Sequence, residues 1–142
     1  MTFWKVISVH YRSKGSKYNS RTVELDGMIF DSAKEYRRFC ELSLLEKAGA
    51  ISGLQRQVKF ELIPQQREES TEVFKKGKNK GLPKPGKLLE PSVCYVADFV
   101  YFQDGERIVE DVKGYKKGAA YNIFVIKRKL MLYFHDIRIR EV

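Results

Sequence analysis

The sequence is poor in cysteine, in long apolar runs and in signals for export. Cys40 and Cys94 are the only cysteines and form no Cys-x-x-Cys unit, which excludes a zinc ribbon or a dithiol redox motif. We expect both to be buried free thiols. No apolar run approaches the roughly 18 residues that a membrane span requires. The N-terminus lacks the basic start, apolar middle and cleavage site of a secretory signal, so we expect a cytoplasmic protein without membrane contact.

Positive charge is what the sequence has in excess. Its 142 residues include 27 Lys and Arg against 18 Asp and Glu, a formal net charge of +9. A chain of this length is expected to form one domain and to bury enough surface to fold without disulfides or a structural metal. Excess positive charge is typical of proteins that bind polyanions. We therefore expect nucleic acid as the partner.

The charge and the chain-breaking residues are unevenly distributed. Residues 1–21 carry five Lys and Arg and no acid, and residues 113–129 carry six and no acid. Such blocks either bind a polyanion or are solvated faces. All four prolines lie within 64–91, a segment also rich in Lys and Gly, which predicts a long loop. This loop is either a tolerated surface insertion or a basic flap that closes on a nucleic-acid backbone.

Hydrophobic periodicity and turn residues predict the order of the regular elements. A hairpin around Asp26-Gly27 is followed by a helix whose expected stop is Gly49, and a second hairpin turns at Asp104-Gly105. The predicted elements are a hairpin over 22–25 and 28–30, a helix over 32–48, strands over 57–63, 94–102 and 107–113, a helix over 119–134 and a strand over 137–141. This order predicts an α/β fold with an N-terminal hairpin, a helix, three antiparallel strands, a second helix and a final strand.

The second hairpin is predicted to bring two carboxylates to opposite positions. A two-residue Asp-Gly loop pairs Gln103 with Glu106, and the same register places Asp98 opposite Asp111. Because side chains alternate across a strand, Asp98, Asp111 and Lys113 are predicted to share one face. The expected residues of this face are Val96, Asp98, Val100, Val109, Asp111 and Lys113, with Glu110 on the opposite face.

Two carboxylates about 5 Å apart on an apolar face repel each other, so an opposite charge is needed between them. A divalent cation meets this need, because hard oxygen ligands at such a separation suit Mg²⁺ or Mn²⁺. Lys113 offers only partial relief. The alternatives are a register shifted by one residue, or a carboxylate that points to solvent at a sheet edge.

These residues resemble the signature of the PD-(D/E)xK nuclease superfamily, which includes restriction endonucleases and archaeal Holliday-junction resolvases. Over about residues 17–142 the chain is also similar to a family of small phage and prophage proteins thought to be endonucleases of this superfamily. The resembling motifs are Phe30-Asp31-Ser32-x-x-Glu35, Gln55-Arg56-Gln57, Tyr95-Val96-Ala97-Asp98-Phe99 and Glu110-Asp111-Val112-Lys113-Gly114. No Pro precedes Asp98, so the nominal Pro-Asp pair is absent. The resemblance implies a restriction-endonuclease-like core with a mixed central sheet.

The resemblance also implies a role for each matching residue. Asp98 and Asp111, with the backbone carbonyl of Val112, would ligate Mg²⁺, for which Mn²⁺ is a substitute. Lys113 would orient or help to deprotonate the attacking water and would stabilise charge that develops on the phosphate. These roles together imply a Mg²⁺-dependent endodeoxyribonuclease.

Glu35 has two interpretations. By resemblance it matches an acidic residue that many members of the superfamily supply from the first helix, often through a metal-bound water. By local sequence it fits a capping box with Ser32, in which the two side chains satisfy free backbone amides at the start of the helix. Both interpretations stay open at the level of sequence.

Further residues are expected to contact nucleic acid. Lys127 is assigned to a phosphate beside the metal site, since related nucleases often place Lys or Gln on this helix; alternatively its ammonium lies in water above the core. Gln57 either lines the site or faces solvent on an edge strand. The remaining candidates are Tyr121, Lys116 and Lys117 around the second helix, and Lys14 and Lys17 near the N-terminus.

The sequence therefore predicts a metal-dependent DNA endonuclease that acts on branched or phage recombination and replication intermediates. We expect a basic arm over residues 1–16 and one nuclease domain over 17–142 that carries the basic loop at 64–91. A symmetric homodimer would cut both strands, and phage replication or recombination proteins are candidate partners in a bacterial host cytoplasm. The alternatives are a non-catalytic nucleic-acid-binding module on a nuclease-like fold, or a small RNA-binding or ribosome-associated protein.

Overall fold

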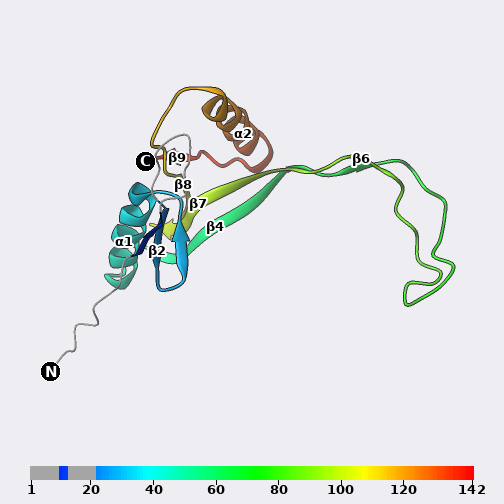
Figure 1. The fold of residues 1–142 in the computed structure, drawn as a ribbon, viewed down its shortest axis with the longest axis horizontal. Helices are drawn as coiled ribbons and strands as arrows, with labels where there is room; N and C mark the ends of the chain where they lie inside the picture. The colour runs from blue at the N-terminus through cyan, green and yellow to red at the C-terminus, as the bar shows by residue number, and fades with distance from the viewer. Residues whose placement is uncertain (1–9, 13–21) are drawn as a thin grey trace.

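The structure, a computed structural model, describes residues 10–12 and 22–142 (Figure 1). These residues form a mixed α/β fold in which two helices accompany a central four-stranded sheet. The N-terminal part is a smaller sheet of strands β1 (His10–Arg12), β2 (Thr22–Leu25) and β3 (Met28–Phe30). The helices are α1 (Ala33–Lys47) and α2 (Ala119–His135).

The central sheet has the strand order β4-β7-β8-β9 and is mixed. The first three strands pair antiparallel, whereas β9 pairs parallel to β8. A parallel pair needs a crossover connection, and α2 supplies it between β8 and β9. The strands of this sheet are β4 (Ser52–Ile63), β7 (Val93–Gln103), β8 (Glu106–Asp111) and β9 (Arg140–Glu141).

The two helices cover opposite faces of the central sheet. Phe99 and Tyr101 on β7 pack in a cluster with Leu42 of α1. Val100, which lies between them on the same strand, packs instead in the cluster that holds Met131 of α2. Since neighbouring residues of a strand point to opposite faces, the sheet is sandwiched between α1 and α2.

Helix α1 also joins the central sheet to the small one. Phe30 of β3 is fully buried and stacks near Phe39 of α1, with ring centroids 5.2 Å apart. The helix begins where predicted, because the Ser32 side chain accepts a hydrogen bond from the Glu35 backbone N–H at 3.1 Å. It ends before Gly49, whose φ of 75° suits a residue without a side chain.

The segment 64–91, predicted as a long loop, is in part a two-stranded ribbon. Strands β5 (Gln66–Arg67) and β6 (Leu88–Glu90) pair antiparallel, and Val73 and Pro83 form an isolated bridge farther out. Figure 1 shows this ribbon running from the ends of β4 and β7 away from the body of the protein. The prediction failed because prolines and glycines break local patterns, whereas the ribbon is held by pairing between distant residues.

Other sequence predictions differ from the structure in smaller ways. The first long strand begins at Ser52 rather than residue 57, and the last strand is limited to Arg140–Glu141. Cys40 and Cys94 are free thiols as expected, but both are half-buried rather than buried. Three residues of the expected N-terminal arm, His10–Arg12, pair with β2, and the rest of that arm lies outside the described residues.

Candidate functional site

The hairpin of β7 and β8 has the predicted register. Its pairs run from Gln103 opposite Glu106 to Phe99 opposite Glu110. One step farther along the same ladder come Asp98 and Asp111. The two carboxylates interact, since the charge of Asp111 contributes to a raised pKa of Asp98. The Asp-Gly turn therefore brings together the two acids that the sequence singled out.

The prediction that Val96, Asp98 and Val100 share a face is wrong. Val96 is exposed, whereas Val100 is buried in the cluster on the α2 side, where it joins Tyr95 and Ala97. The alternation of side chains between the two faces of β7 is therefore shifted by one residue between Ala97 and Phe99. Asp98 lies at this slip.

The cause of the slip is visible on the neighbouring strand. Gln57 of β4 lies between the pairs Arg56 to Phe99 and Val58 to Ala97, and its φ is 51°. A non-glycine residue in this left-handed region interrupts the pleat and is unfavourable by roughly 1 kcal/mol or more. Such local strain is often found at functional sites, and in this protein it is located opposite Asp98.

Asp98 is a half-buried carboxylate with an unusual protonation equilibrium. Its Oδ2 accepts a hydrogen bond of 2.7 Å from the Val112 backbone N–H, and its Oδ1 lies 3.4 Å from the Gln57 amide nitrogen. Burial, helped by the charges of Asp111 and Glu35 and opposed by the Val112 hydrogen bond, raises the pKa of Asp98 to about 6. A nearby cation would stabilise the ionised form of this carboxylate.

Asp111 is held from two sides. The Tyr95 hydroxyl donates to its Oδ2 at 2.9 Å, and the Lys113 ammonium lies 2.5 Å from its Oδ1. The Lys113 ammonium also lies 3.7 Å from the centre of the Phe124 ring, where a cation is attracted by the ring face. Burial and the charge of Asp111 raise the pKa of Tyr95, so its hydroxyl stays a donor.

Glu35 caps the start of α1, close to the capping box that its sequence allowed, and its role at a metal stays a prediction. Its Oε2 accepts a bond of 3.0 Å from the Asp31 backbone N–H, one residue before the cap position that a standard capping box uses. Its Oε1 points the other way, 3.3 Å from the Gln57 amide nitrogen and 3.6 Å from the Arg56 guanidinium. Burial raises the pKa of Glu35, which is only 3% exposed.

Gln57 and Arg56 tie Glu35 to the sheet. The Gln57 amide nitrogen is shared between Glu35 and Asp98, so one side chain links carboxylates from α1 and β7. The Arg56 guanidinium stacks 3.8 Å from the Phe30 ring centre and donates to the Ile29 carbonyl at 2.8 Å. Among the described residues, its Nε is a buried polar atom without a hydrogen-bond partner. The sequence left Gln57 either lining the site or facing solvent on an edge strand, and it gave Arg56 no role; Gln57 is exposed on the edge strand β4 and also contacts both carboxylates.

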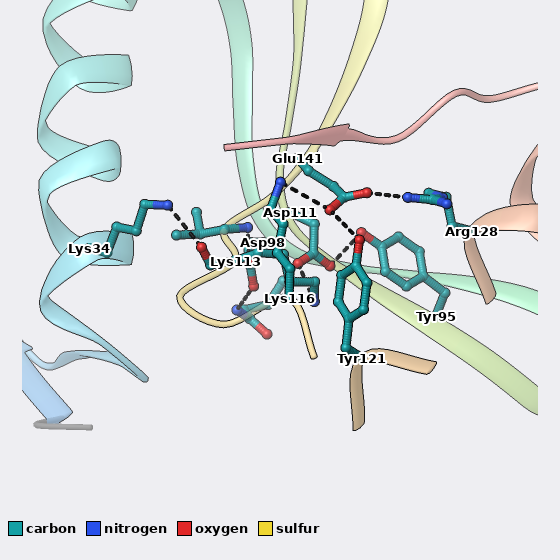
Figure 2. A network of polar contacts seen from close by, with 11 residues as sticks. Lys34, Tyr95, Asp98, Asp111, Lys113, Lys116, Tyr121, Arg128 and Glu141 are labelled. Carbon is teal, nitrogen blue, oxygen red and sulfur yellow. Dashed lines mark hydrogen bonds and ion pairs between the residues drawn. The ribbon is translucent and has the colours of Figure 1, made fainter. Parts of the chain in front are cut away.

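A further carboxylate, Glu141 of β9, organises the neighbouring cations. It accepts from the Tyr121 hydroxyl at 3.2 Å, pairs with Lys116 at 3.3 Å and contacts Arg128. Burial opposes ionisation, but these hydrogen bonds lower the pKa of Glu141 below its usual value. Figure 2 shows this group next to Asp111, with Tyr95 and Tyr121 side by side near both carboxylates.

Glu110 points away from this site, as predicted. It is fully buried and is bound by Arg38 of α1 at 2.9 and 2.8 Å and by the Tyr101 hydroxyl at 2.6 Å. Burial alone would raise the pKa of Glu110, yet the bonds from Arg38 and Tyr101 lower it. Glu110 is thus a paired structural carboxylate that links α1 to β8.

A basic groove lies next to the carboxylates, on the α1 side. Its volume is about 420 Å³, and it is lined by Lys34, Arg37, Arg38, Glu41, Val112 and Val142. The Lys34 ammonium donates to the Lys113 carbonyl at 2.9 Å, which connects this groove to the site (Figure 2). The i, i+3 and i+4 spacing of Lys34, Arg37 and Arg38 is a sequence signal for a basic helix face, although the sequence predictions include none of the three.

The structure brings only some of the predicted residues together. Glu35, Gln57, Asp98, Asp111 and Lys113 form one connected group, which we call the carboxylate cluster. Lys116 and Tyr121 lie in the adjoining Glu141 group. Lys127 is half-buried and Lys117 exposed, and neither forms an ion pair with a described residue. Lys14 and Lys17 lie outside the described residues.

The carboxylate cluster offers the oxygen ligands that a hard divalent cation prefers. In the described part of the chain, no three His, Cys, Asp or Glu side chains form a ready metal-binding group. Mg²⁺ does not need one, because it keeps several waters and is commonly held by one or two carboxylates. The repulsion among Asp98, Asp111 and Glu35 that helps to raise the pKa of Asp98 is the feature that a bound cation would relieve.

The chain belongs to a known sequence family. Residues 15–142 match the family described as "Protein of unknown function (DUF1064)". No match is found among curated proteins or among solved structures. Within the described residues, neither helix is long and apolar enough to cross a membrane.

Proposed function

We propose that this protein is a divalent-metal-dependent DNA endonuclease with a restriction-endonuclease-like core of the PD-(D/E)xK type. The carboxylate cluster carries this proposal. Asp98 and Asp111 interact across the β7–β8 hairpin, and Lys113 follows two residues later with its ammonium 2.5 Å from Asp111. Two acids and a lysine in this order suit hydrolysis of a phosphodiester bond.

The four charged residues of the cluster each have a defined part in the proposed reaction. Asp98 and Asp111, with the Val112 carbonyl, would hold Mg²⁺ or Mn²⁺, and Glu35 would bind through a water. When bound, the cation supplies Lewis acidity and makes water a stronger nucleophile at neutral pH. Lys113 orients the attacking water and stabilises negative charge on the phosphate, while the Tyr95 hydroxyl fixes the orientation of Asp111.

The surroundings of the cluster favour a DNA backbone as the substrate. The groove beside Val112 is lined by Lys34, Arg37 and Arg38, and Lys116 and Tyr121 lie on the other side near Glu141. Cations on both sides of a catalytic centre attract phosphates without selecting bases. We therefore propose a nuclease that recognises DNA structure rather than sequence, with branched intermediates as candidate substrates and a homodimer as the candidate assembly.

The proposal predicts metal-dependent cleavage that is lost when the cluster is altered. The assay uses labelled four-way junction, flap, duplex and single-stranded DNA with Mg²⁺, Mn²⁺ or EDTA. We expect Asp111→Asn and Lys113→Ala each to lower the single-turnover rate by about 100-fold or more, because one removes a ligand charge and the other a cation beside the phosphate. Calorimetric titration of Mn²⁺ should show weaker binding to Asp111→Asn.

Matched controls separate chemistry from stability. Asp104→Asn makes the same change at the exposed Asp-Gly turn, and Lys47→Ala removes an exposed lysine at the far end of α1. Both controls should cleave like the wild type. Full activity in either cluster variant would refute the proposed site. Salt-sensitive DNA binding without cleavage of any substrate would favour a non-catalytic nucleic-acid-binding module instead.

A further inference from the structure

The ribbon that projects from the central sheet is a separate feature of this protein. We define the ribbon arm as residues 64–92 and its tip as residues 73–83. Beyond β5 and β6, its two strands stay hydrogen bonded through Glu68 to Lys87, Lys84 to Glu72, and Phe74 to Leu82. At Gly86 the strands approach so closely that a Cβ atom would lie 1.9 Å from the Glu68 carbonyl oxygen. The arm is therefore a paired structure along its length.

The arm does not contribute to the hydrophobic core of the described residues. No residue of the arm belongs to the hydrophobic clusters formed by the described residues. Most of its apolar side chains are exposed, with Val73 48% and Leu82 55% exposed, and Phe74 is half-buried. Ordering a long ribbon costs conformational entropy, and this arm buries little apolar surface that would offset the cost. We therefore expect that the arm binds a partner.

The charge of the arm identifies the chemistry of that partner. The four acids of the arm lie outside its tip, and the one next to the tip, Glu72, pairs with Lys84 at 3.0 Å. The tip contains no acid, and it carries four exposed lysines: Lys75, Lys76, Lys78 and Lys80. None of the four forms an ion pair with a described residue. A cluster of unpaired lysines suits binding to a phosphate backbone. A two-stranded ribbon also fits within the DNA major groove.

The length of the arm limits how far from the carboxylate cluster its tip can contact DNA. Twenty residues separate Gln57 at the carboxylate cluster from Gly77 at the tip, and extended chain of that length spans at most about 66 Å. Figure 1 shows the arm leading outward from the same strands, β4 and β7, that carry the cluster. One turn of duplex DNA is about 34 Å. The tip can therefore contact a backbone segment at most about two helical turns from the scissile bond.

We infer that the ribbon arm is a DNA-contacting device whose tip lysines hold duplex DNA at a distance from the carboxylate cluster. This inference rests on the proposed function for the identity of the partner. It adds a length requirement: a duplex too short to reach the tip forfeits these contacts.

The test measures binding in EDTA, so that it does not depend on cleavage. Fluorescence anisotropy compares duplexes of about 12 and about 40 base pairs over a range of salt concentrations. For wild type, we expect log K to fall more steeply with log salt on the long duplex, by about 0.9 for each tip lysine that neutralises a phosphate. The variant Lys75→Gln, Lys76→Gln, Lys78→Gln, Lys80→Gln should lose that excess slope and bind the short duplex like the wild type.

A matched pair controls for total charge. Lys78→Gln at the tip should reduce the slope on the long duplex, whereas Lys47→Gln on α1 should leave it unchanged. An unchanged slope in the four-lysine variant, or an equal loss on both duplexes, would overturn the inference. So would a tip variant that alters only self-association in sedimentation velocity, which would assign the arm to a protein contact. A tip-dependent slope without cleavage would retain the arm and refute the nuclease.

Discussion

At the scale of single residues, Asp98 shows how the site combines strain and charge. It lies opposite the left-handed Gln57, where the alternation of β7 slips, and its pKa is raised to about 6. The carboxylate is therefore kept where it is energetically unfavourable in the absence of a cation. Sites built for function rather than stability commonly show this property.

This gives a prediction for Asp98→Asn without metal. The folded protein holds the Asp98 proton more tightly than the unfolded chain, so Asp98 lowers the free energy of unfolding as pH rises from about 4 through 6. Allowing for partial exposure, we expect Asp98→Asn to raise the free energy of unfolding by about 1–2 kcal/mol at pH 7.5 and by almost nothing at pH 4. The variant should also be inactive.

Urea unfolding in EDTA at both pH values checks this prediction. Asp104→Asn, the same change at an exposed turn, should show no gain at either pH. If Asp98→Asn were less stable than the wild type at pH 7.5, the Asp98 carboxylate would be a stabilising group, and the cluster would not be a strained cation site.

At the scale of secondary-structure elements, polar links position α1 against the sheet. The Arg38 guanidinium binds Glu110 of β8 through two nitrogens, and the Lys34 ammonium binds the carbonyl of Lys113. Glu35 lies in the first turn of the same helix, so the attachment of α1 to β8 fixes the distance between Glu35 and the hairpin that carries Asp111. The alignment of the site thus depends on contacts outside it.

We therefore predict that Arg38→Ala is strongly destabilising. It leaves Glu110 fully buried with only Tyr101 and the more distant Arg140, 3.5 Å away, as partners. Removing one partner of a buried pair typically lowers the free energy of unfolding by about 3–5 kcal/mol. Because the pKa of Glu110 is lowered in the folded state, its stabilisation is present above the usual pKa and is lost as pH falls through the folded value.

Arg37 provides the comparison for this measurement. It is exposed on the same helix, and its Nε bonds only the Ala33 carbonyl, so Arg37→Ala should change the free energy of unfolding by less than about 0.5 kcal/mol. Similar losses for Arg38→Ala and Arg37→Ala in urea unfolding would show that the Glu110 pair contributes little.

At the scale of the whole molecule, the net charge of +9 is distributed over several separate surfaces. In the described part of the chain they are the groove along α1, the cations around Glu141 and the tip of the ribbon arm, and the sequence of residues 1–21 adds five Lys and Arg. Separated cations can follow one DNA backbone over a long path, and each contact adds to the salt dependence of binding. The proposed nuclease would thus obtain its affinity from many weak contacts.

The N-terminal lysines allow this distribution to be tested. We predict that Lys14→Gln with Lys17→Gln lowers the salt-dependence slope of DNA binding by up to about 1.8, because each lysine neutralises at most one phosphate. Single-turnover cleavage at saturating protein should keep its rate, since neither residue belongs to the carboxylate cluster. A slower rate at saturation with unchanged binding would exclude a role for these lysines in binding alone.

The sequence by itself determined the local features of this protein. The Asp-Gly turn set the hairpin register and so the meeting of Asp98 with Asp111, and Ser32 set the start of α1. These features follow from a few neighbouring residues, whose conformational preferences do not depend on the rest of the chain.

Only the tertiary structure decided how those features combine. Gln57 adopts its left-handed conformation opposite Asp98 of the neighbouring strand. Hydrogen bonds from Tyr95 to Asp111 and from Tyr121 to Glu141 likewise join residues that are far apart in sequence. The ribbon arm likewise depends on pairing across a long connection. Such contacts are selected by packing and by burial of charge, which no local pattern encodes, and they determine which charged residues the protein directs toward one site.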